Sequence, residues 1–325
     1  MQTIVNQDIS TAVAFLKKGE IIAIPTETVY GLAGNALNPD ALINIFETKQ
    51  RPFFDPLIIH LAEISQLHQY AVSVPDIIQE ILNVFSPGPV SVILPKKEII
   101  PDLASSGLPT AAFRIPSHPL AQSLLSSLPF PLAAPSANPF GYVSPTSPSH
   151  VMDQLGGKIP MILDGGDCPI GVESTILGYE NDTLIIYREG GISREDILTQ
   201  FPSLKITMYS GGVSPAAPGL LKSHYAPIKP IYLVSDLIST SSIQSGIPGV
   251  LSFTNPFIEI QTPYRVVLSP SGSLHEAARN LFAALRQLDK SACDYILAEP
   301  VPEHGIGRAI NDRLNKASYK QSLNH

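Results

Sequence analysis

Short apolar runs of strand length alternate with amphipathic stretches along this chain. The run Ile21–Ile24 is β-branched and predicts a buried strand, whereas Ser273–Leu288 repeats apolar residues every three or four positions and predicts a helix. A shorter helix is expected over Ile9–Lys18, capped by Asp8 or Ser10. Strands and helices mix without a strict strand–helix–strand repeat, so the pattern predicts an α/β fold with a mixed sheet.

The same pattern predicts elements throughout the chain. Residues 25–32 are expected to form a polar loop that leaves the first strand. Further helices are expected at residues 39–49, 75–85, 119–128, from 193 onward and at 307–317. Further strands are expected at residues 57–61, 90–94, 111–115, 132–134, 161–163, 172–177, 184–187, 231–234, 249–253, 265–268 and 295–298.

One segment interrupts the alternation and suggests a domain boundary. Residues 209–228 are rich in glycine, proline and polar residues, which is typical of a linker or a long functional loop. Since domains usually span about 100–200 residues, two domains are the natural expectation for 325 residues. The predicted organisation is a catalytic domain at 1–205, a linker or lid at 206–229 and a smaller α/β domain at 230–325.

Composition narrows the class of protein. Hydrophobic residues make up 44% and charged residues 15%, which is ample for a packed core. The formal net charge of −7 argues against a broad nucleic-acid-binding surface, so no stable nucleic-acid complex is expected. Cys168 and Cys293 are far apart and lack C-x-x-C spacing, which is typical of reduced thiols. Neither a secretory signal nor a membrane-length apolar run is visible, so a cytoplasmic location is expected.

Several common signatures of nucleotide and hydrolase sites are missing from the sequence. No G-x-x-x-x-G-K-[ST] loop, G-x-G-x-x-G fingerprint or G-x-S-x-G elbow occurs in it. His275 and Glu276 begin like a zinc-binding helix, but the second histidine is absent, and a polar helix face is the simpler interpretation. Common hydrolase and kinase chemistry is therefore not indicated.

Polar side chains gather instead where predicted strands and helices end. Arg114 lies in the apolar run 111–115, where an arginine needs a carboxylate or phosphate partner from the protein or from a ligand. Lys49 and Arg51 lie at a predicted helix end. Cations there stabilise the helix dipole, so this structural role competes with binding of a ligand. Several such segments with three cations together favour a pocket for a carboxylate and phosphates. The hydroxyl-rich or amide-bearing segments are 26–30, 134–138, 171–176 and 188–191.

Five ordered motifs between residues 25 and 192 resemble those of one family. The chain is similar to the YrdC-like family of threonylcarbamoyl-AMP synthases, and its second half resembles the longer, two-domain branch. The motifs are PTETVYGL at 25–32, K-x-R-P at 49–52, PSAN at 135–138, GVESTI at 171–176 and R-x-G-x-I at 188–192, with HYAP at 224–227 and GIGRAINDRLNKA at 305–317 in the second half.

The resemblance implies a fold and a reaction. The expected fold is a twisted, mixed, open sheet with flanking helices, followed by a smaller Rossmann-like domain after a long linker. The expected enzyme is a nucleotidyltransferase that joins L-threonine, bicarbonate and ATP, with Mg²⁺, into threonylcarbamoyl-AMP and pyrophosphate, without a dedicated protein metal site. The product would pass to the machinery that modifies adenosine 37 in tRNAs reading ANN codons.

The resemblance also implies roles for individual residues. Lys49, Arg51 and Arg114 would carry catalysis by positioning the substrates and neutralising charge. Asp55 stands where the family usually has asparagine or another non-acidic polar residue, and a carboxylate repels triphosphate unless a metal ion lies between them. Threonine would contact Thr28, His60, Arg114, Ser174 and the backbone at Ala134; ATP would contact Lys49, Arg51, Asp55, Thr110, Ser136, Asn138, Ser144, Arg188, His224 and Tyr225, the last two as part of a lid.

Two other functions remain open at this level. An RNA-binding module of the same fold would use the cations for RNA phosphates, although the negative net charge and the hydroxyl-rich motifs weigh against it. A related carbamoyl-transfer enzyme would use carbamoyl phosphate instead of bicarbonate, but such proteins usually carry extra domains.

Overall fold

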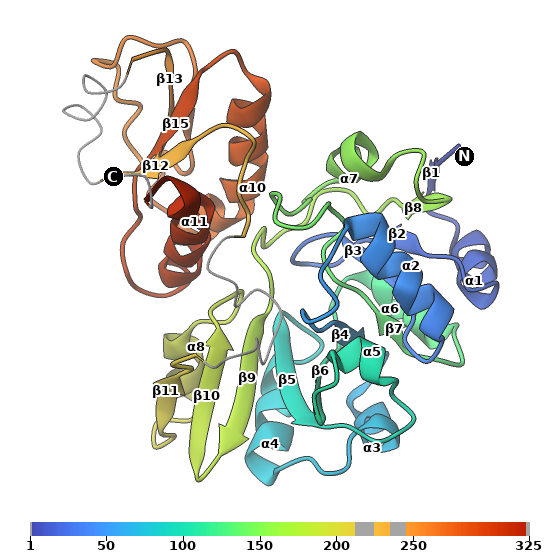
Figure 1. The fold of residues 1–325 in the computed structure, drawn as a ribbon. Coiled ribbons are helices and arrows are strands. Elements are labelled where there is room, and N and C mark those ends of the chain that lie inside the picture. Colours follow the sequence, from blue (N-terminus) through green and yellow to red (C-terminus); the bar gives the residue numbers. More distant parts are fainter. Residues whose placement is uncertain (1, 212–223, 235–244, 323–325) are drawn as a thin grey trace. The chain divides into compact units, whose positions relative to one another are not determined.

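The computed structural model describes residues 2–211, 224–234 and 245–322. They divide into two compact units, which we describe separately (Figure 1). The first comprises Met1–Phe140, Pro145–Pro169 and Glu173–Leu220, and the second Gly141–Ser144, Ile170–Val172 and Leu221–His325. Most of the linker predicted at 206–229 lies outside the described residues, so its proposed role as a lid stays a prediction.

One mixed sheet forms the centre of the first unit (Figure 1). Its strands are short, and most begin and end within a few residues of the predicted runs. They are β1 (Ile4–Asn6), β2 (Ile22–Ile24), β3 (Gly31–Asn35), β4 (Ile58–His60), β5 (Val90–Pro95), β6 (Thr110–Arg114), β7 (Leu132–Ala133), β8 (Met161–Leu163), β9 (Thr175–Glu180), β10 (Thr183–Arg188) and β11 (Ile206–Met208).

The strand order is β1-β8-β2-β3-β7-β4-β6-β5-β9-β10-β11, so six of the ten neighbouring pairs are not consecutive in sequence. β4 pairs parallel with β6, and β5 pairs antiparallel with β6 but parallel with β9. The predicted α/β fold with a mixed sheet is thereby confirmed. The order also brings the ends of β4, β6 and β10, which carry His60, Arg114 and Arg188, into one part of the sheet.

Helices flank this sheet. Several begin with the expected caps: the Asp8 side chain accepts from the Ser10 amide at the start of α1, and Asn38 caps α2 ahead of Pro39 at its first turn. The helical segments are α1 (Ile9–Lys17), α2 (Pro39–Lys49), the 3₁₀ turn η1 (Ile64–Gln66), α3 (Leu67–Tyr70), α4 (Asp76–Phe85), α5 (Asp102–Ser105), α6 (Pro119–Ser126), α7 (Pro148–Leu155) and α8 (Arg194–Gln200).

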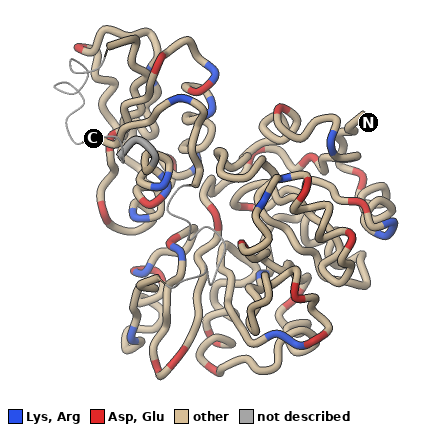
Figure 2. The backbone as a smooth tube through the Cα atoms, in the orientation of Figure 1, with Lys and Arg blue, Asp and Glu red and all other residues tan. Residues whose placement is uncertain are grey.

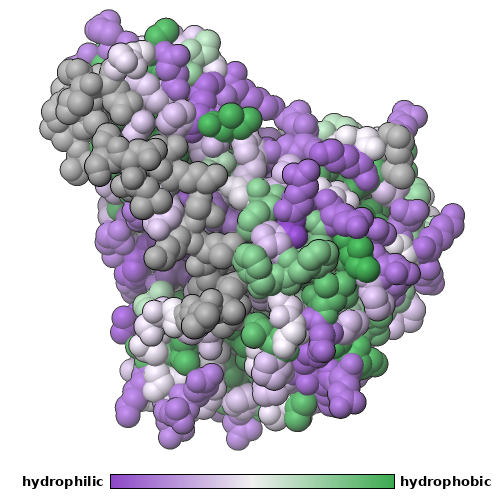
Figure 3. Space-filling model, in the orientation of Figure 1, coloured by the Kyte–Doolittle hydropathy of each residue, from purple (hydrophilic) through white to green (hydrophobic). Residues whose placement is uncertain are grey.

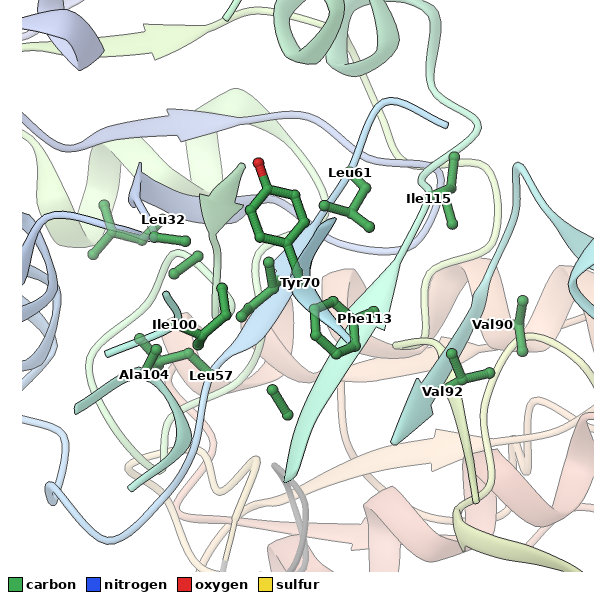
Figure 4. Close-up of a cluster of buried hydrophobic side chains, with 14 of the residues drawn as sticks. Leu32, Leu57, Leu61, Tyr70, Val90, Val92, Ile100, Ala104, Phe113 and Ile115 are labelled. Atoms are coloured by element: carbon green, nitrogen blue, oxygen red, sulfur yellow. The ribbon is translucent and has the colours of Figure 1, made fainter. Parts of the chain in front are cut away.

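Hydrophobic side chains from distant segments fill the core of the first unit. Figure 4 shows Leu57, Tyr70 and Phe113 of one cluster close together, and each of them is at least 93% buried. A second cluster includes Leu16 of α1 and Leu124 of α6. Because a fully buried Leu or Phe side chain contributes about 1.5–3 kcal/mol, these clusters hold the strands that carry the polar motifs in place.

The segment after the first strand differs from the prediction. The polar loop predicted at 25–32 ends two residues early, and Gly31–Asn35 forms β3, which pairs antiparallel with both β2 and β7. Its sequence, GLAGN, has no β-branched residue, so local propensity does not predict a strand. The pairing places small residues where neighbours approach closely: a Cβ on Gly34 would lie 3.0 Å from Ile21 and 3.2 Å from Ile45.

The second unit holds a smaller, fully parallel sheet, as predicted for the C-terminal region. The strand order is β12-β15-β13-β14, and helices α10 and α11 contact β13 and β12 (Figure 1). The bounds are β12 (Ile231–Leu233), β13 (Pro248–Ser252), β14 (Arg265–Val267), β15 (Tyr295–Ala298), α10 (Leu274–Lys290) and α11 (Gly307–Ser322).

Two short segments, Gly141–Ser144 and Ile170–Val172, are far in sequence from the rest of this second unit. The buried guanidinium of Arg286 in α10 donates to the carbonyls of Val143 and Ser144 and lies over the ring of Tyr142. Gly171 has a φ of +82°, and a Cβ there would lie 2.4 Å from the Ala278 carbonyl. Glycine is therefore required at 171 for both backbone conformation and close approach.

Surface charge and hydropathy are mixed. Figure 2 shows cationic and anionic positions interspersed along both units. Figure 3 shows hydrophilic residues over most of this face, with hydrophobic residues gathered on part of the first unit. Large hydrophobic side chains exposed in that unit include Phe53 and Phe54, each 55% accessible. Among the described helices, none combines the length and apolarity needed to cross a bilayer.

Candidate functional site

A row of side chains crosses five neighbouring strands of the first unit at one level. His60 of β4 is in register with Arg114 of β6, and Arg114 with Ser91 of β5. Ser91 is in register with Ile176 of β9, which faces Arg188 of β10 across a β-bulge. Residues in register project from the same face of a sheet. The sheet therefore brings three predicted site residues, His60, Arg114 and Arg188, into one row.

Arg114 has an internal acidic partner. Its Nη2 lies 2.7 Å from Oε1 of Glu27, and both side chains are more than 90% buried. The second oxygen of Glu27 accepts from the Ser117 amide at 3.0 Å. The guanidinium Nε has no hydrogen-bond partner among the described residues. Arg114 is thus held through one nitrogen, and part of its donor capacity is left over for another anion.

The loop that carries Glu27 is shaped by its own hydroxyls. Thr26 Oγ1 lies 2.8 Å from the hydroxyl of Thr28 and donates to the Val29 carbonyl at 2.7 Å. The Tyr30 hydroxyl bridges to the Gly166 carbonyl at 2.8 Å, and burial raises its pKa. These bonds place Thr28, which is fully buried, beside the residue that pairs with Arg114.

Lys49 connects the end of α2 to the PSAN segment. Its Nζ donates to the carbonyls of Ser136 and Asn138 at 2.5 and 2.6 Å. Burial, reinforced by the charge of Arg51, lowers the pKa of the Lys49 ammonium well below its ordinary value. The amide of Ala134 donates to Ile58, so the backbone of this segment is fixed against β4. Lys49 therefore fixes the loop that presents two predicted ATP contacts.

Asp55 is a fully buried carboxylate among cations. Its Oδ2 is 2.9 Å from Nη2 of Arg51, an ion-pair distance, yet neither carboxylate oxygen has a well-aligned hydrogen-bond donor among the described residues. Burial raises the pKa of Asp55, and the charges of Arg51, Lys49 and Arg188 act in the opposite direction. Because those three cations all act on this one group, the structure places the predicted phosphate-binding cations around an internal acid.

Arg188 fixes the GVESTI segment. Its Nε and Nη2 donate to the Ser174 carbonyl at 3.1 and 2.9 Å, and Nη2 also lies 3.1 Å from the Ser174 hydroxyl. A Cβ on Gly190 would lie 2.4 Å from the backbone of residues 173–175. The segment after Arg188 can approach GVESTI this closely only because residue 190 is glycine.

His60 is neutral in the folded protein. Burial lowers the pKa of its imidazole from 6.5 to about 3, and the charge of Arg114 adds to the effect. The ring Nδ1 lies 3.1 Å from the Ile58 carbonyl, and the ring also has a hydrogen-bond contact with the Leu132 backbone.

A small apolar floor adjoins the row on the same face of the sheet. It consists of Ile58, Ala112 and Ile176, which form one buried cluster with Tyr187 packed against it. Thr110 is separated from Arg114 by the length of β6, roughly 13 Å at strand rise, but alternation directs it to the same face. The predicted ATP contact at Thr110 thus lies beyond the floor rather than beside Arg114.

Three predicted ATP contacts belong to the second unit. Ser144 is among the residues that Arg286 holds. The His224 amide donates to the Lys316 carbonyl, and the Tyr225 ring lies between Phe282, with ring centroids 5.7 Å apart, and the guanidinium of Arg313. These contacts fix Tyr225, which has a φ of +63°, against α10 and α11. Their predicted contacts to ATP stay predictions.

Two residues of this site, Glu27 and Ser91, were not predicted from the sequence. Glu27 was part of the PTETVYGL motif, but its pairing with Arg114 depends on the fold. Ser91 interrupts the apolar strand V-S-V-I-L, and its hydroxyl lies 2.8 Å from that of Ser174. A serine at an inward position of a buried strand is the one signal that could have identified it.

The fold and the site define a class of protein. It is an α/β protein in which buried cations bind the turns at the ends of strands. The family model Sua5_yciO_yrdC, described as "Telomere recombination", matches residues 14–190, and "Threonylcarbamoyl-AMP synthase, C-terminal domain" matches 192–318. The chain belongs to the Sua5/YciO/YrdC family, with the two-domain architecture expected from the motifs.

Relatives match over nearly the whole chain. A threonylcarbamoyl-AMP synthase of Pyrococcus abyssi is 39% identical, covering 95% of this chain and 94% of that protein. One from Bacillus subtilis is 38% identical, covering 95% and 92%. A solved structure, "P. abyssi Sua5 complexed with L-threonine", aligns with a TM-score of 0.88 and 36% identity over 98% of each chain.

Proposed function

We propose that this chain is a threonylcarbamoyl-AMP synthase, a nucleotidyltransferase that uses L-threonine, bicarbonate and ATP. The observation that carries the proposal is the state of Arg114: a buried guanidinium held at one nitrogen by Glu27, with Nε unpaired among the described residues. A buried arginine with spare donors suits a ligand carboxylate, since charge-assisted bonds to planar carboxylates are strong and directional. Relatives of this name and a threonine-bound neighbour support the assignment.

The threonine site is built around Arg114. Its guanidinium binds the amino-acid carboxylate. Neutral His60 and the hydroxyls of Thr28 and Ser174 form hydrogen bonds with the rest of the substrate. The Ala134 backbone borders this site next to β4. Because His60 is neutral, it places no second positive charge beside the substrate amine and does not repel the ammonium form.

ATP lies along the same face. The apolar floor of Ile58, Ala112 and Ile176 supports the nucleoside, and Lys49, Arg51 and Arg188 neutralise the phosphates. Ser136, Asn138 and Thr110 add polar contacts. Lys49 and Arg188 also fix the binding turns through backbone carbonyls, so substrate binding does not have to order these turns.

The reaction needs no protein nucleophile. The threonine amine attacks the carbon of bicarbonate, water leaves, and a carbamate forms. A carbamate oxygen then attacks the α-phosphorus of ATP, and the bond to pyrophosphate breaks. The chain contributes by holding the carbamate against the α-phosphate and by opposing the negative charge that accumulates between them.

Mg²⁺ is expected to arrive with ATP. Mg²⁺ is usually bound by one or two carboxylates together with substrate phosphates. Asp55 offers one carboxylate whose oxygens lack aligned donors, and among the described residues no group of three metal-ligating side chains exists. These features fit an ion held mainly by the nucleotide, with Asp55 as the protein ligand; the ion would neutralise phosphate charge.

The activity is tested by measuring pyrophosphate release from ATP with threonine and bicarbonate present, and with each omitted. Release that requires both, together with threonylcarbamoyl-AMP detected by mass spectrometry, is expected. Release independent of threonine would reject the proposal. Adding the tRNA threonylcarbamoyl-transferase machinery and a tRNA that reads ANN codons should then convert adenosine 37. The interspersed charges of Figure 2 do not favour the RNA-binding alternative.

A further inference from the structure

Two fully buried serine hydroxyls meet within the polar row. Ser91 Oγ of β5 lies 2.8 Å from Ser174 Oγ of the GVESTI segment, and both residues are 0% exposed. Arg188 Nη2 lies 3.1 Å from the same Ser174 oxygen. Ser91 is in register with Arg114 on one side and with Ile176 on the other. No role has so far been assigned to Ser91.

Counting protons shows that this cluster is incomplete. Arginine only donates, so Ser174 Oγ accepts from Arg188. The single contact between the serines uses one hydroxyl proton, and the other has no acceptor among the described residues. If Ser174 donated to Ser91, the leftover proton would belong to Ser91, inside the sheet. If Ser91 donates to Ser174, the leftover proton belongs to Ser174, in the predicted substrate-binding segment.

We propose that Ser91 is a positioning residue that donates to Ser174 Oγ and thereby directs the Ser174 proton to an oxygen of the bound amino-acid substrate. A substrate oxygen would complete this arrangement, because Ser174 is a predicted threonine contact, whereas Ser91 lies inside β5. Donation from Ser91 and Arg188 also polarises the Ser174 hydroxyl and strengthens its bond to the substrate. The inference rests on the proposed function and assigns one more residue to the threonine side of the site.

The test measures KM for threonine and for ATP in pyrophosphate release, and threonine binding by calorimetry. Ser91→Ala is expected to raise KM and Kd for threonine about fivefold to tenfold, the effect of losing one hydrogen bond to the site. KM for ATP should change less than twofold. Ser91→Thr retains the hydroxyl and should restore threonine binding. Ser91→Cys keeps the volume with a weak donor and should behave like alanine, which covers the case in which Ser91→Ala folds poorly.

A double-mutant cycle separates positioning from packing. In a Ser174→Ala background, Ser91→Ala should add less than a twofold change, because the hydroxyl that Ser91 contacts is already gone. An equal effect in both backgrounds, or an unchanged threonine KM in Ser91→Ala, would overturn the proposal. Ser105→Ala is the matched control: Ser105 is also 0% exposed, and its hydroxyl donates to the Leu108 carbonyl at 2.9 Å.

The two possible failures are distinguishable. A wild-type chain without threonine-dependent pyrophosphate release would reject the proposed function itself. An active wild type whose Ser91 variants bind threonine normally would reject only the role of Ser91.

Discussion

Arg114 and Glu27 form a buried ion pair, 2.7 Å long, that joins β6 to the loop after β2. Removing one partner of such a pair leaves an uncompensated buried charge, which costs about 3–5 kcal/mol. Glu27→Gln should therefore lower the free energy of unfolding by about 3 kcal/mol. It should also weaken threonine binding, because Arg114 loses the contact that orients it. Urea denaturation and calorimetry measure the two effects.

An exposed ion pair provides the control for that substitution. Lys96 and Asp102 are also 2.8 Å apart, but the Asp102 side chain is 82% accessible. Asp102→Asn should change the unfolding free energy by less than about 1 kcal/mol, since solvent screens exposed pairs. Equal losses of unfolding free energy in the two variants would show that burial does not increase the contribution of the Arg114–Glu27 pair to stability.

The stability of the first unit should depend on His60 in acid. Its folded-state pKa, about 3, lies below the ordinary 6.5, so the unfolded chain binds more protons between these values. The stability associated with neutral His60 is complete above pH 6.5 and is lost as the pH falls, with a slope of about 1.4 kcal/mol per pH unit.

Replacing His60 isolates this contribution. His60→Gln should unfold with a shallower pH dependence than the wild type between pH 6.5 and 3, measured by urea titration at each pH. Asp55 has a raised pKa and the opposite sign, but it is present in both proteins and cancels in the comparison. His68, an exposed histidine of α3, is the control, and His68→Gln should leave the slope unchanged. An equal pH dependence of the unfolding free energy in the wild type and His60→Gln would contradict the lowered pKa of His60.

Asp55 should oppose nucleotide binding in its ionised form. It shares the surroundings of Lys49, Arg51 and Arg188, so its negative charge repels the triphosphate that those cations bind. In a metal-free titration, Asp55→Asn should bind ATP roughly tenfold more tightly than the wild type. Because the Asp55 pKa is raised, this difference should shrink as the pH is lowered and the wild-type carboxyl takes up a proton.

Adding Mg²⁺ tests whether Asp55 is a ligand of the ion that ATP carries. If Asp55 contacts the ion carried by ATP, Mg²⁺ should improve binding to the wild type more than binding to Asp55→Asn. Equal ATP affinity of the two proteins at every pH, with and without Mg²⁺, would show that Asp55 does not face the phosphates.

Arg286 should determine the order of residues 141–144 within the second unit. It donates to the carbonyls of Val143 and Ser144 and packs on Tyr142, whose hydroxyl donates to Asp289 at 2.5 Å. Arg286→Met keeps the aliphatic length but loses charge-assisted bonds worth about 2 kcal/mol. Hydrogen exchange at amides 142–144 should accelerate correspondingly.

Another arginine of the same helix serves as the reference. Arg279 is exposed on α10, and Arg279→Met should leave exchange at these amides unchanged. Unaltered protection in Arg286→Met would mean that backbone contacts alone hold the segment.

Much of the fold followed from local patterns in the sequence. The helices at 39–49 and 274–290 and the strands at 161–163 and 295–298 were predicted to within two residues, because caps and hydrophobic periodicity act over short distances. β3 was missed because its small residues carry no strand signal and become a strand only by pairing with β2 and β7.

In the candidate site, too, some features follow from the sequence and others only from the fold. The sequence by itself determined which residue types gather in the polar motifs, and it required a partner for Arg114 because a buried guanidinium cannot remain uncompensated. Only the tertiary structure decided that Glu27 is that partner, that Ser91 meets Ser174 and that Asp55 lies among three cations. The Arg114–Glu27 and Ser91–Ser174 pairs depend on strand order and register, which join residues 83 or more positions apart and leave no local signature.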